Sequence, residues 1–538
     1  MPARRPTPSE LRGARPVFAL VVSWLGRDHR FATEPLLVTL NSGPVVRFSG
    51  SLDLRGYVDS MGRPGTAQLG GSASMGVEFE GINLVQEYLQ GRILEGATCE
   101  LSMIFVRAGA VSTVWENRIV QLSGVVSRPQ VGFQDRPAGF AALTVVSRPF
   151  DDQTPILRSQ DKITKISQPD SSADYYGGVY PLVLGSPGDA DTPGSPGYLI
   201  RTTAGSRRLL IGVGRQAATK VTVSDEDGIQ LTQRDVQHKT DGLGNVHAYV
   251  SVSGSTGSFN KADGKHFVHW TNLGVDQFGY RNPFGSGGLT KAPDVFRYFL
   301  GLTPNLVDGA AWVSSRPIFD RYTFGGYVDD PSATVWSFLS SQLLPLLPLN
   351  VRIGPDGVYP ISLFFSHSVG NLPQITIDPI DGIVQVSPVQ ITKQIRDVVN
   401  GFALSYFHNA RENRLSRQLV ATPDDNVSDR VRVEASQRSR EIYGAREGAE
   451  VEGAYVDNDS SAQQILRWLL LDRGFLHMAV QVKAAPRYGW LTVGDHISLT
   501  AERLGMTGRR AVVTSKSWDG DAWRYVFAWS LAPMEATL

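Results

Sequence analysis

The sequence predicts a mainly β, multidomain fold with a smaller α+β part. Apolar and polar residues alternate over much of both ends of the chain, which is the pattern of half-buried strands. The 55 glycines and 31 prolines indicate frequent turns. A length of 538 residues corresponds to roughly three to five domains. We therefore expect two tube-like β-barrel domains that flank an inserted β-domain and a small helix-containing domain.

Changes in composition and periodicity divide the chain into four predicted domains. They are an N-terminal β-barrel-like domain (1–155), an inserted Gly/Ser-rich β-domain (156–288), an α+β middle domain (289–390) and a C-terminal β-barrel-like domain with one helix (391–538). Hydrophobic residues make up 41% of the chain, which is sufficient for several packed cores and excludes an extended disordered protein.

In the N-terminal domain, two segments place every second side chain on one apolar face. These positions are Phe18, Leu20, Val22 and Trp24 in the first segment and Cys99, Leu101, Met103 and Phe105 in the second. Further strands are predicted at Pro44–Phe48, Arg118–Val126 and Phe140–Val146. Only Ile82–Leu89 has its apolar residues at helical spacing. A barrel or sandwich with one short helix fits this pattern.

The inserted domain is predicted from the segment Asp151–Gly264, which is rich in Gly, Ser, Asp and Thr. Within it, Gly185–Gly197 has the composition of a long exposed loop. Strands are expected at Arg208–Ile211, Lys220–Val223 and Val246–Val252, where apolar residues return. This arrangement indicates a second, smaller β-structure between the two terminal domains.

The middle domain begins where helical spacing returns. A helix is predicted over Asp294–Leu300, with Thr290 as its cap. A second helix is expected to begin at Asp330 and to end at Pro345, because proline breaks a helix interior. The dipeptide at 356–357, Asp-Gly between two apolar runs, predicts a hairpin turn. The predicted buried side of the second helix is Val335, Phe338, Leu339 and Leu343.

The C-terminal domain combines one helix with alternating strands. The helix is built on Ile465, Leu466, Trp468 and Leu469, and Gly474 is its expected stop. Strands are predicted at Leu476–Val482, Leu491–Thr500 and Arg510–Ser515, followed by a hairpin that turns at Asp519-Gly520. Four aromatic residues then share one face, and we expect them to lie in a core rather than against a neighbouring subunit. They are Trp523, Tyr525, Phe527 and Trp529.

Charge and cysteine content exclude several classes of protein. Lys plus Arg and Asp plus Glu are both 52, and the resulting zero net charge argues against a strongly basic nucleic-acid binder. The single cysteine, Cys99, excludes a disulfide framework and a cysteine-rich metal site. No stretch approaches 18 consecutive apolar residues, so no membrane span is predicted. We expect the chain to be made, and at first to remain, in the cytoplasm.

Three motifs resemble catalytic or metal sites, and each has a simpler interpretation. The run Gly212–Ala217 matches a dinucleotide loop, but strand-like residues follow it where a helix must face the pyrophosphate. His266 and His269 would point to opposite faces of an extended segment and would not share a metal. Adjacent carboxylates lack the separation that a glycosidase needs across a sugar. These pairs are Asp151-Asp152, Asp329-Asp330 and Asp424-Asp425. We therefore predict no catalytic, cofactor-binding or metal-binding residues, and no cofactor.

Several segments resemble the baseplate hub and tail-tip hub proteins of phages with long non-contractile tails and of gene-transfer-agent-like particles. The stretch Pro293–Leu363 looks like the middle domain of these hubs, and Val399–Tyr406 resembles the same family. The closing segments Leu491–Leu499, Ala511–Trp518 and Trp523–Trp529 are similar to the C-terminal barrel of the hubs. No hydrolase module of the kind found in larger relatives is recognisable.

The resemblance implies a non-enzymatic structural protein of the virion, located at the tail tip and assembled in the host bacterial cytoplasm. Such hubs are homotrimers whose two barrels per subunit present six similar units to the distal tail or tail tube ring. They carry a central fibre or spike protein, and DNA would pass through their lumen without specific binding.

Two alternative functions stay open from the sequence. A hexameric distal tail protein, or a receptor-binding tip protein, would share the virion location but differ in stoichiometry or in binding glycans. A carbohydrate-active enzyme would use a pair of carboxylates, since β-rich chains with many aromatic residues sometimes bind glycans.

Overall fold

The computed structural model describes most of the 538-residue chain. The described residues are 14–40, 43–61, 74–80, 82–107, 113–132, 139–147, 150–157, 161–164, 178–189, 191–201, 207–231, 233–241, 243–252, 265–270, 279–354, 356–363, 372–421 and 430–532.

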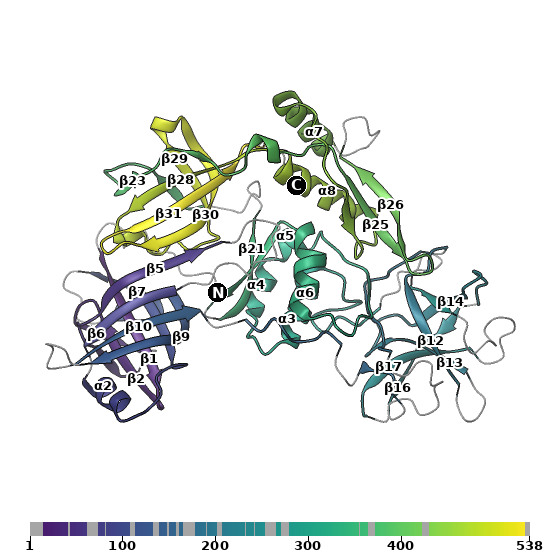
Figure 1. Ribbon diagram of the computed structural model, residues 1–538, viewed down its shortest axis with the longest axis horizontal. Coiled ribbons are helices and arrows are strands. Elements are labelled where there is room, and N and C mark those ends of the chain that lie inside the picture. Colours follow the sequence, from purple (N-terminus) through teal and green to yellow (C-terminus); the bar gives the residue numbers. More distant parts are fainter. Residues whose placement is uncertain are drawn as a thin grey trace.

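The molecule is elongated, with β-structure at both ends and helices between them (Figure 1). The purple and blue N-terminal strands and the yellow C-terminal strands lie together at the left of the view. The teal strands of the inserted segment lie at the right, and the helical part is in the centre. The predicted fold class, mainly β and multidomain with a smaller α+β part, is confirmed.

Residues 14–147 form the N-terminal unit, an antiparallel sheet in the order β2-β1-β7-β9-β10-β6-β5. The helix α2 (Ile82–Leu89) has its predicted bounds. The alternating apolar positions predicted in β1 and β7 are buried in one core. The strands are β1 (Ala14–Trp24), β2 (Arg27–Ala32), β5 (Asp53–Ser60), β6 (Ser74–Glu80), β7 (Thr98–Arg107), β9 (Ile119–Gly132) and β10 (Phe140–Ser147).

A small second sheet covers the outer side of β1 and β7. Its order is β4-β3-β8, with bounds Val45–Phe48, Leu36–Thr39 and Thr113–Val114. Its inner side chains, Leu36, Val38 and Phe48, pack on Val17 and Ile104. The N-terminal unit therefore has strands with apolar packing on both faces, which explains why β7 is buried almost throughout.

The C-terminal unit, residues 374–391 and 477–530, continues the same sheet. Strand β30 is 13 residues long and divides one edge between two partners. Its first part pairs antiparallel with β29, and Ser515–Trp518 pairs antiparallel with Tyr57–Ser60 of β5. The strands are β22 (Gln374–Thr376), β23 (Ile383–Gln385), β24 (Gln390–Ile391), β28 (His477–Ala484), β29 (His496–Ala501), β30 (Met506–Trp518) and β31 (Trp523–Ser530).

One hydrophobic core serves both terminal units. The four aromatic residues of β31 are buried in it, as predicted, together with the apolar face of β1. The Trp523 ring lies 5.7 Å from the Phe18 ring and 5.6 Å from the Tyr57 ring, between ring centroids. Burial of these rings is a large apolar contribution that neither unit makes alone.

The middle of the molecule has a core of its own, which two separate stretches of chain supply for the most part. Five residues before the inserted sheet also belong to it: Ile156, Leu157, Val179, Leu182 and Leu184. Residues 289–363 supply four helices and the hairpin predicted at 356–357. Residues 402–475 supply two helices and a three-stranded sheet, β26-β25-β27. The elements are α3 (Ala292–Leu302), α4 (Gly309–Ser314), α5 (Arg316–Phe319), α6 (Val335–Phe338), β20 (Leu349–Gly354), β21 (Gly357–Ser362), β25 (Ala403–Asn409), β26 (Arg414–Val420), α7 (Arg430–Tyr443), β27 (Val451–Gly453) and α8 (Asp459–Arg473).

The predicted division at residue 390 therefore does not separate two cores. The helix expected in the C-terminal barrel is α8, and it packs with the middle helices instead. A pattern of apolar spacing identifies which face of α8 is buried, but it does not identify the element that covers that face. The chain leaves the C-terminal unit at Ile391 and returns to it at His477.

The inserted segment forms a seven-stranded sheet in the order β15-β14-β18-β12-β13-β17-β16, with a separate small core. The strands are β12 (Ser195–Arg201), β13 (Arg207–Val213), β14 (Lys220–Asp225), β15 (Arg234–Asp235), β16 (Gln237–Thr240), β17 (Val246–Ser251) and β18 (His266–His269). Just before them, β11 (Leu182–Leu184) pairs with β19 (Gly326–Val328) of the middle part.

Three local predictions are wrong. Most of the described residues of Gly185–Gly197 are buried, and Ser195 already begins β12. Helix α3 begins at Ala292 after Lys291, without a side-chain cap from Thr290. The second helix, expected to begin at Asp330, begins at Val335 as α6, and Thr334 caps it through a reciprocal pair of hydrogen bonds with Ser337. Asp330 instead accepts from the backbone of Ser332 in the preceding turn.

Among the described residues, no helix is both long and apolar enough to cross a bilayer. The helix α7 was not predicted, because its sequence, RVRVEASQRSREIY, carries many charged and serine residues instead of a clear apolar stripe.

The shared core leads to a prediction about Trp523. Replacing Trp523 by Leu should lower the free energy of unfolding by about 1–3 kcal/mol. It should also reduce amide protection in β1 and β7 as well as in β31, because these strands bury one core. Hydrogen exchange followed by mass spectrometry measures this. Trp312→Leu, equally buried in the middle core, is the matched control and should leave β1 unchanged. Loss of protection confined to β31 would contradict a shared core.

Candidate assembly interface

The seam between β5 and β30 fixes how the two terminal units sit against each other. Tyr57 faces Trp518 and Asp59 faces Lys516 in the antiparallel register. Tyr57 and Asp59 point inward and are buried, while Val58 between them is 55% exposed. Alternation along β5 therefore brings one aromatic and one acidic side chain into the joint.

A buried ion pair ties the middle part to this seam. The guanidinium of Arg352, on β20, binds the carboxylate of Asp59, on β5, and both side chains are almost fully buried. The other terminal nitrogen, Nη1, donates to the carbonyl oxygen of Val493 at 2.7 Å. One side chain thus contacts the N-terminal unit and the C-terminal unit from the middle part.

Lys516 is a second buried cation at the same joint. Its ammonium donates to the side-chain oxygen of Gln121 and to the carbonyl oxygen of Gly489, the latter at 2.6 Å. It also lies 4.3 Å from the centroid of the Trp523 ring. Burial lowers the pKa of Lys516 from 10.5 to about 7, although the nearby Asp59 carboxylate acts in the opposite direction.

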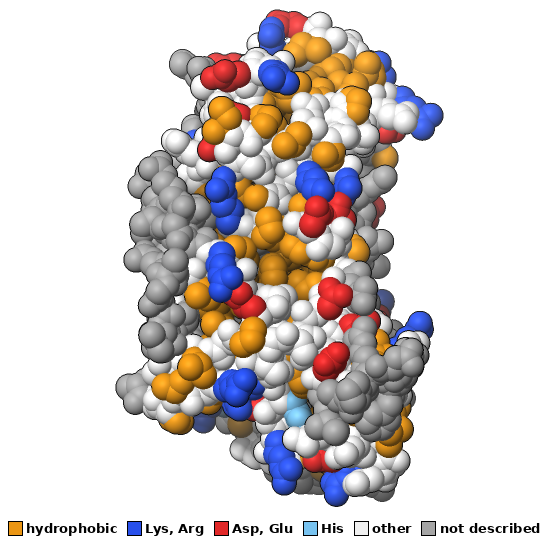
Figure 2. All heavy atoms as spheres, turned by 90° about the vertical axis from the view of Figure 1, so that its left-hand side faces the viewer, with side chains coloured by type: hydrophobic (Ala, Val, Ile, Leu, Met, Phe, Trp, Pro, Cys, Tyr) orange, Lys and Arg blue, Asp and Glu red, His pale blue; other side chains and the backbone are white. Residues whose placement is uncertain are grey.

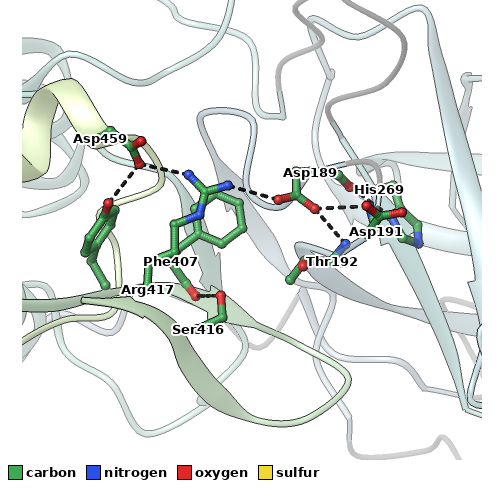
Figure 3. A network of polar contacts seen from close by, with 9 residues as sticks. Asp189, Asp191, Thr192, His269, Phe407, Ser416, Arg417 and Asp459 are labelled. Atoms are coloured by element: carbon green, nitrogen blue, oxygen red, sulfur yellow. Dashed lines mark hydrogen bonds and ion pairs between the residues drawn. The ribbon is translucent and has the colours of Figure 1, made fainter. Parts of the chain in front are cut away.

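A polar network joins the inserted β-sheet to the middle part (Figure 3). Arg417, on β26, contacts Asp459 at 2.8 Å and Asp189 at 3.1 Å, each between a guanidinium nitrogen and a carboxylate oxygen. The guanidinium also lies 3.9 Å from the centroid of the Phe407 ring. Asp189 accepts from the backbone of Thr192 at 2.7 Å, which fixes the loop that presents its carboxylate.

The predicted histidine pair lies in the same region. His266 and His269 are buried on β18. The Nδ1 atom of His269 is 3.1 Å from the backbone oxygen of Asp189, and its Nε2 atom is 2.9 Å from Ser224 Oγ. Burial lowers the pKa of His269. Within the described ranges, no cluster of three His, Cys, Asp or Glu side chains could hold a metal ion.

The remaining motif residues lie apart from one another. Gly214 has a positive φ of 68° in a turn after β13, and no helix follows. Burial raises the pKa of Asp329, while Asp330 binds Ser332 in its turn. Asp151 accepts from Thr154, and Asp424 and Asp425 lie outside the described residues. Cys99 is buried in β7, and burial raises the pKa of its thiol to about 12.

Sequence reasoning missed the residues that build the joint, Asp59, Arg352 and Lys516. The sequence carries one usable signal, which is a lone charge inside an otherwise apolar strand pattern. That signal does not identify which residue the charge will contact. Asp59 and Lys516 are 457 positions apart in the sequence, and the register of the sheet brings them together.

The outside of the two terminal units carries hydrophobic side chains over a wide area. Figure 2 shows this face, with a dense group at the top, over the C-terminal unit, and a hollow lined by hydrophobic side chains near the middle. Exposed large apolar residues of the C-terminal unit and the segment after it are Ile380, Val384, Val386, Ile391 and Ile395. A face that gathers exposed apolar side chains in this way is typical of a binding surface.

Comparison with known proteins finds likeness in structure but not in sequence. No protein-family model and no curated protein matches the chain. A tail protein from Neisseria meningitidis MC58 is 9% identical, with a TM-score of 0.39 over 95% of this chain and 96% of that one. The chain is similar to phage tail proteins. The 43 kDa tail protein of prophage MuSo2 from Shewanella oneidensis is 8% identical, with a TM-score of 0.36 over 97% and 99% of the chains. A chain of the gene transfer agent virion is 12% identical, with a TM-score of 0.36 over 68% and 90%.

Breaking the buried ion pair should be costly. Asp59→Asn leaves the Arg352 charge without its counter-ion, and we expect the free energy of unfolding to fall by about 3–5 kcal/mol. Urea unfolding measures this. Asp521→Asn is the matched control, because Asp521 pairs with Lys483 at 3.2 Å on the surface. The control should cost less than about 1 kcal/mol, and equal losses would contradict the assigned role of the joint.

The lowered pKa of Lys516 predicts a pH dependence of stability. Between pH 7 and 10.5 the unfolded chain binds more protons at this residue than the folded chain does, so stability should rise with pH in that window. From pH 7 to pH 9 the parent should gain about 1–2 kcal/mol that Lys516→Met does not gain. Urea unfolding at both pH values tests this. Lys483→Met, at a partly exposed site on the same sheet, should keep the slope of the parent.

Proposed function

We propose that this chain is a structural subunit of a phage tail-tip or baseplate hub, and that three copies form a ring. The observation that carries the proposal is that four strands of each terminal unit stand in the same relative order, and that a backbone-paired seam joins the two units. Three such chains supply six similar β-units, which is the number needed to contact each subunit of a sixfold tail ring once.

The common order of four strands can be followed along each sheet. In the C-terminal unit the sheet order is β28-β31-β30-β29, that is first, last, third and second along the chain. In the N-terminal unit β1, β10, β6 and β5 stand in the same order, with β7 and β9 inserted between β1 and β10. Within the orders just given, all neighbouring strands pair antiparallel, whereas β22 pairs parallel with β29 and β3 pairs parallel with β8. The likeness supports a repeated building block within the chain.

A rigid joint is what such a ring requires. Six alike units close a ring only if the angle within each chain matches the angle between chains. In this chain the inner angle depends on the seam register, the Asp59–Arg352 pair and the shared aromatic core. These features favour a fixed unit over two domains on a flexible linker.

The proposed role works by assembly and not by catalysis. One side of the ring would face the distal tail or tail tube ring, and the other would hold a central fibre or spike protein. DNA would pass through the lumen without specific binding. The proposed location is the tail tip of the virion.

Native mass decides between this proposal and its rivals. Purified protein should sediment as a trimer of the 58.7 kDa chain, about 176 kDa, and electron-microscope class averages should show three-fold rings with six lobes. A monomer at all tested concentrations would overturn the proposal. A hexamer would favour a distal tail ring. Release of soluble sugars from peptidoglycan or capsular polysaccharide, lost on heating the protein, would favour an enzyme.

A further inference from the structure

The turn at Asp378–Gly382 presents a fully exposed isoleucine on a rigid backbone. Ile380 is 90% exposed, which is the highest value for any large apolar side chain that the structure describes. Its backbone nitrogen donates to the Asp378 carboxylate at 2.9 Å, and the Gly382 nitrogen donates to the Pro379 oxygen at 3.0 Å. We call this segment the Ile380 turn.

Further contacts hold the Ile380 turn from the neighbouring strand connection. The backbone oxygen of Asp381 accepts from the Tyr488 hydroxyl at 3.0 Å and from the Arg487 guanidinium. Gly382 has a φ of 76°, and its oxygen accepts from the Ala485 nitrogen at 2.8 Å. A side chain held out by an ordered turn loses little conformational entropy when it binds, so the turn is preorganised for a contact.

The N-terminal unit carries an apolar surface of matching kind. In the β4-β3-β8 sheet, Leu37, Val45 and Val114 lie on the outer face and are 44%, 57% and 45% exposed. Arg47, which faces Leu37 across the strand pair, is exposed on the same face. The three strands contain no acidic residue. We call this surface the β3 outer face.

We propose that the Ile380 turn of one copy docks on the β3 outer face of the next copy and so closes the ring. This inference rests on the proposed function. Ile380 would pack on the three apolar side chains of the β3 outer face, and the exposed Asp381 carboxylate would lie beside Arg47. Charge and apolar area are therefore complementary across the contact.

A second copy of the chain is the occupant that symmetry favours. A ring built by rotation needs two different patches per copy, because each contact joins one patch to the other. The Ile380 turn belongs to the C-terminal unit and the β3 outer face to the N-terminal unit. With this contact, N-terminal and C-terminal units would follow one another alternately around the ring. A second set of exposed apolar residues in the N-terminal unit is a poorer match for the Ile380 turn: Leu25, Leu89 and Ile93. The carboxylate of Glu87, which pairs with Arg27, is close to this set in sequence and would repel the Asp381 carboxylate.

Engineered cysteines test the contact directly. Ile380→Cys would be combined in turn with Leu37→Cys, Val45→Cys or Val114→Cys in the full chain, followed by mild oxidation and a non-reducing gel. At least one pair should give bands of two and three linked chains, and single-cysteine variants should give none. The native Cys99 is buried in the core and does not take part. Ile380→Cys with Leu243→Cys, at an exposed turn of the inserted sheet, is the control and should not cross-link.

The outcomes separate this inference from the function on which it rests. A trimer that cross-links through none of the three pairs would overturn the docking contact and leave the trimeric hub standing. Cross-linking in a variant that combines Ile380→Cys with Ile93→Cys would overturn the choice of the β3 outer face. A parent protein that stays monomeric would overturn the hub proposal itself.

Charge reversal gives an independent readout. Asp381→Arg and Arg47→Asp should each raise the concentration for half-assembly about tenfold, and the double variant should return it toward the parent value. Sedimentation at a series of concentrations measures this. Equal and additive losses in the double variant would show that the two side chains do not meet.

Discussion

The Arg352 guanidinium is a contact at which the N-terminal unit, the C-terminal unit and the middle part meet. It binds Asp59 of the N-terminal unit and the Val493 carbonyl of the C-terminal unit from a strand of the middle part. Removing one partner of such a pair leaves a charge buried without compensation, which costs far more than the intact pair contributes. The arrangement therefore acts as a constraint on relative position more than as a source of stability.

The two joints of the molecule differ in strength. At the seam, backbone pairing, a shared aromatic core and the buried cation Lys516 act together. The inserted sheet is held by β11–β19 pairing and by the Arg417 network, whose side chains are partly exposed. Exposed ion pairs contribute little and weaken in salt. The chain thus combines a double β-unit with an attached sheet that is held by one strand pair, by apolar contacts of Leu182, Leu184 and Val213 with the middle core, and by polar contacts.

Local sequence pattern predicted elements well and their partners poorly. The period-two runs gave the buried faces of β1, β7 and β31, because half-buried strands show their inner face in sequence. Helix α8 was predicted correctly as an element, but it packs in the middle core. The joint residues were missed, since sheet register between segments hundreds of residues apart is a property of the folded chain. The buried loop before β12 was missed because its Gly, Pro and Asp content is also typical of exposed turns.

Buried charge at the seam also explains how its register is fixed. Tyr57 and Asp59 point inward and Val58 points outward, so a shift of β5 by one residue along β30 would turn both inward side chains to solvent. A shift by two residues keeps the inward face inward, and an apolar seam would tolerate it at smaller cost because one apolar side chain replaces another. In this chain a shift would leave the Arg352 charge in the interior without a counter-ion, which would lower the free energy of unfolding by several kcal/mol. The ion pair thereby selects one register, and with it the angle between the two β-units that a closed ring would require.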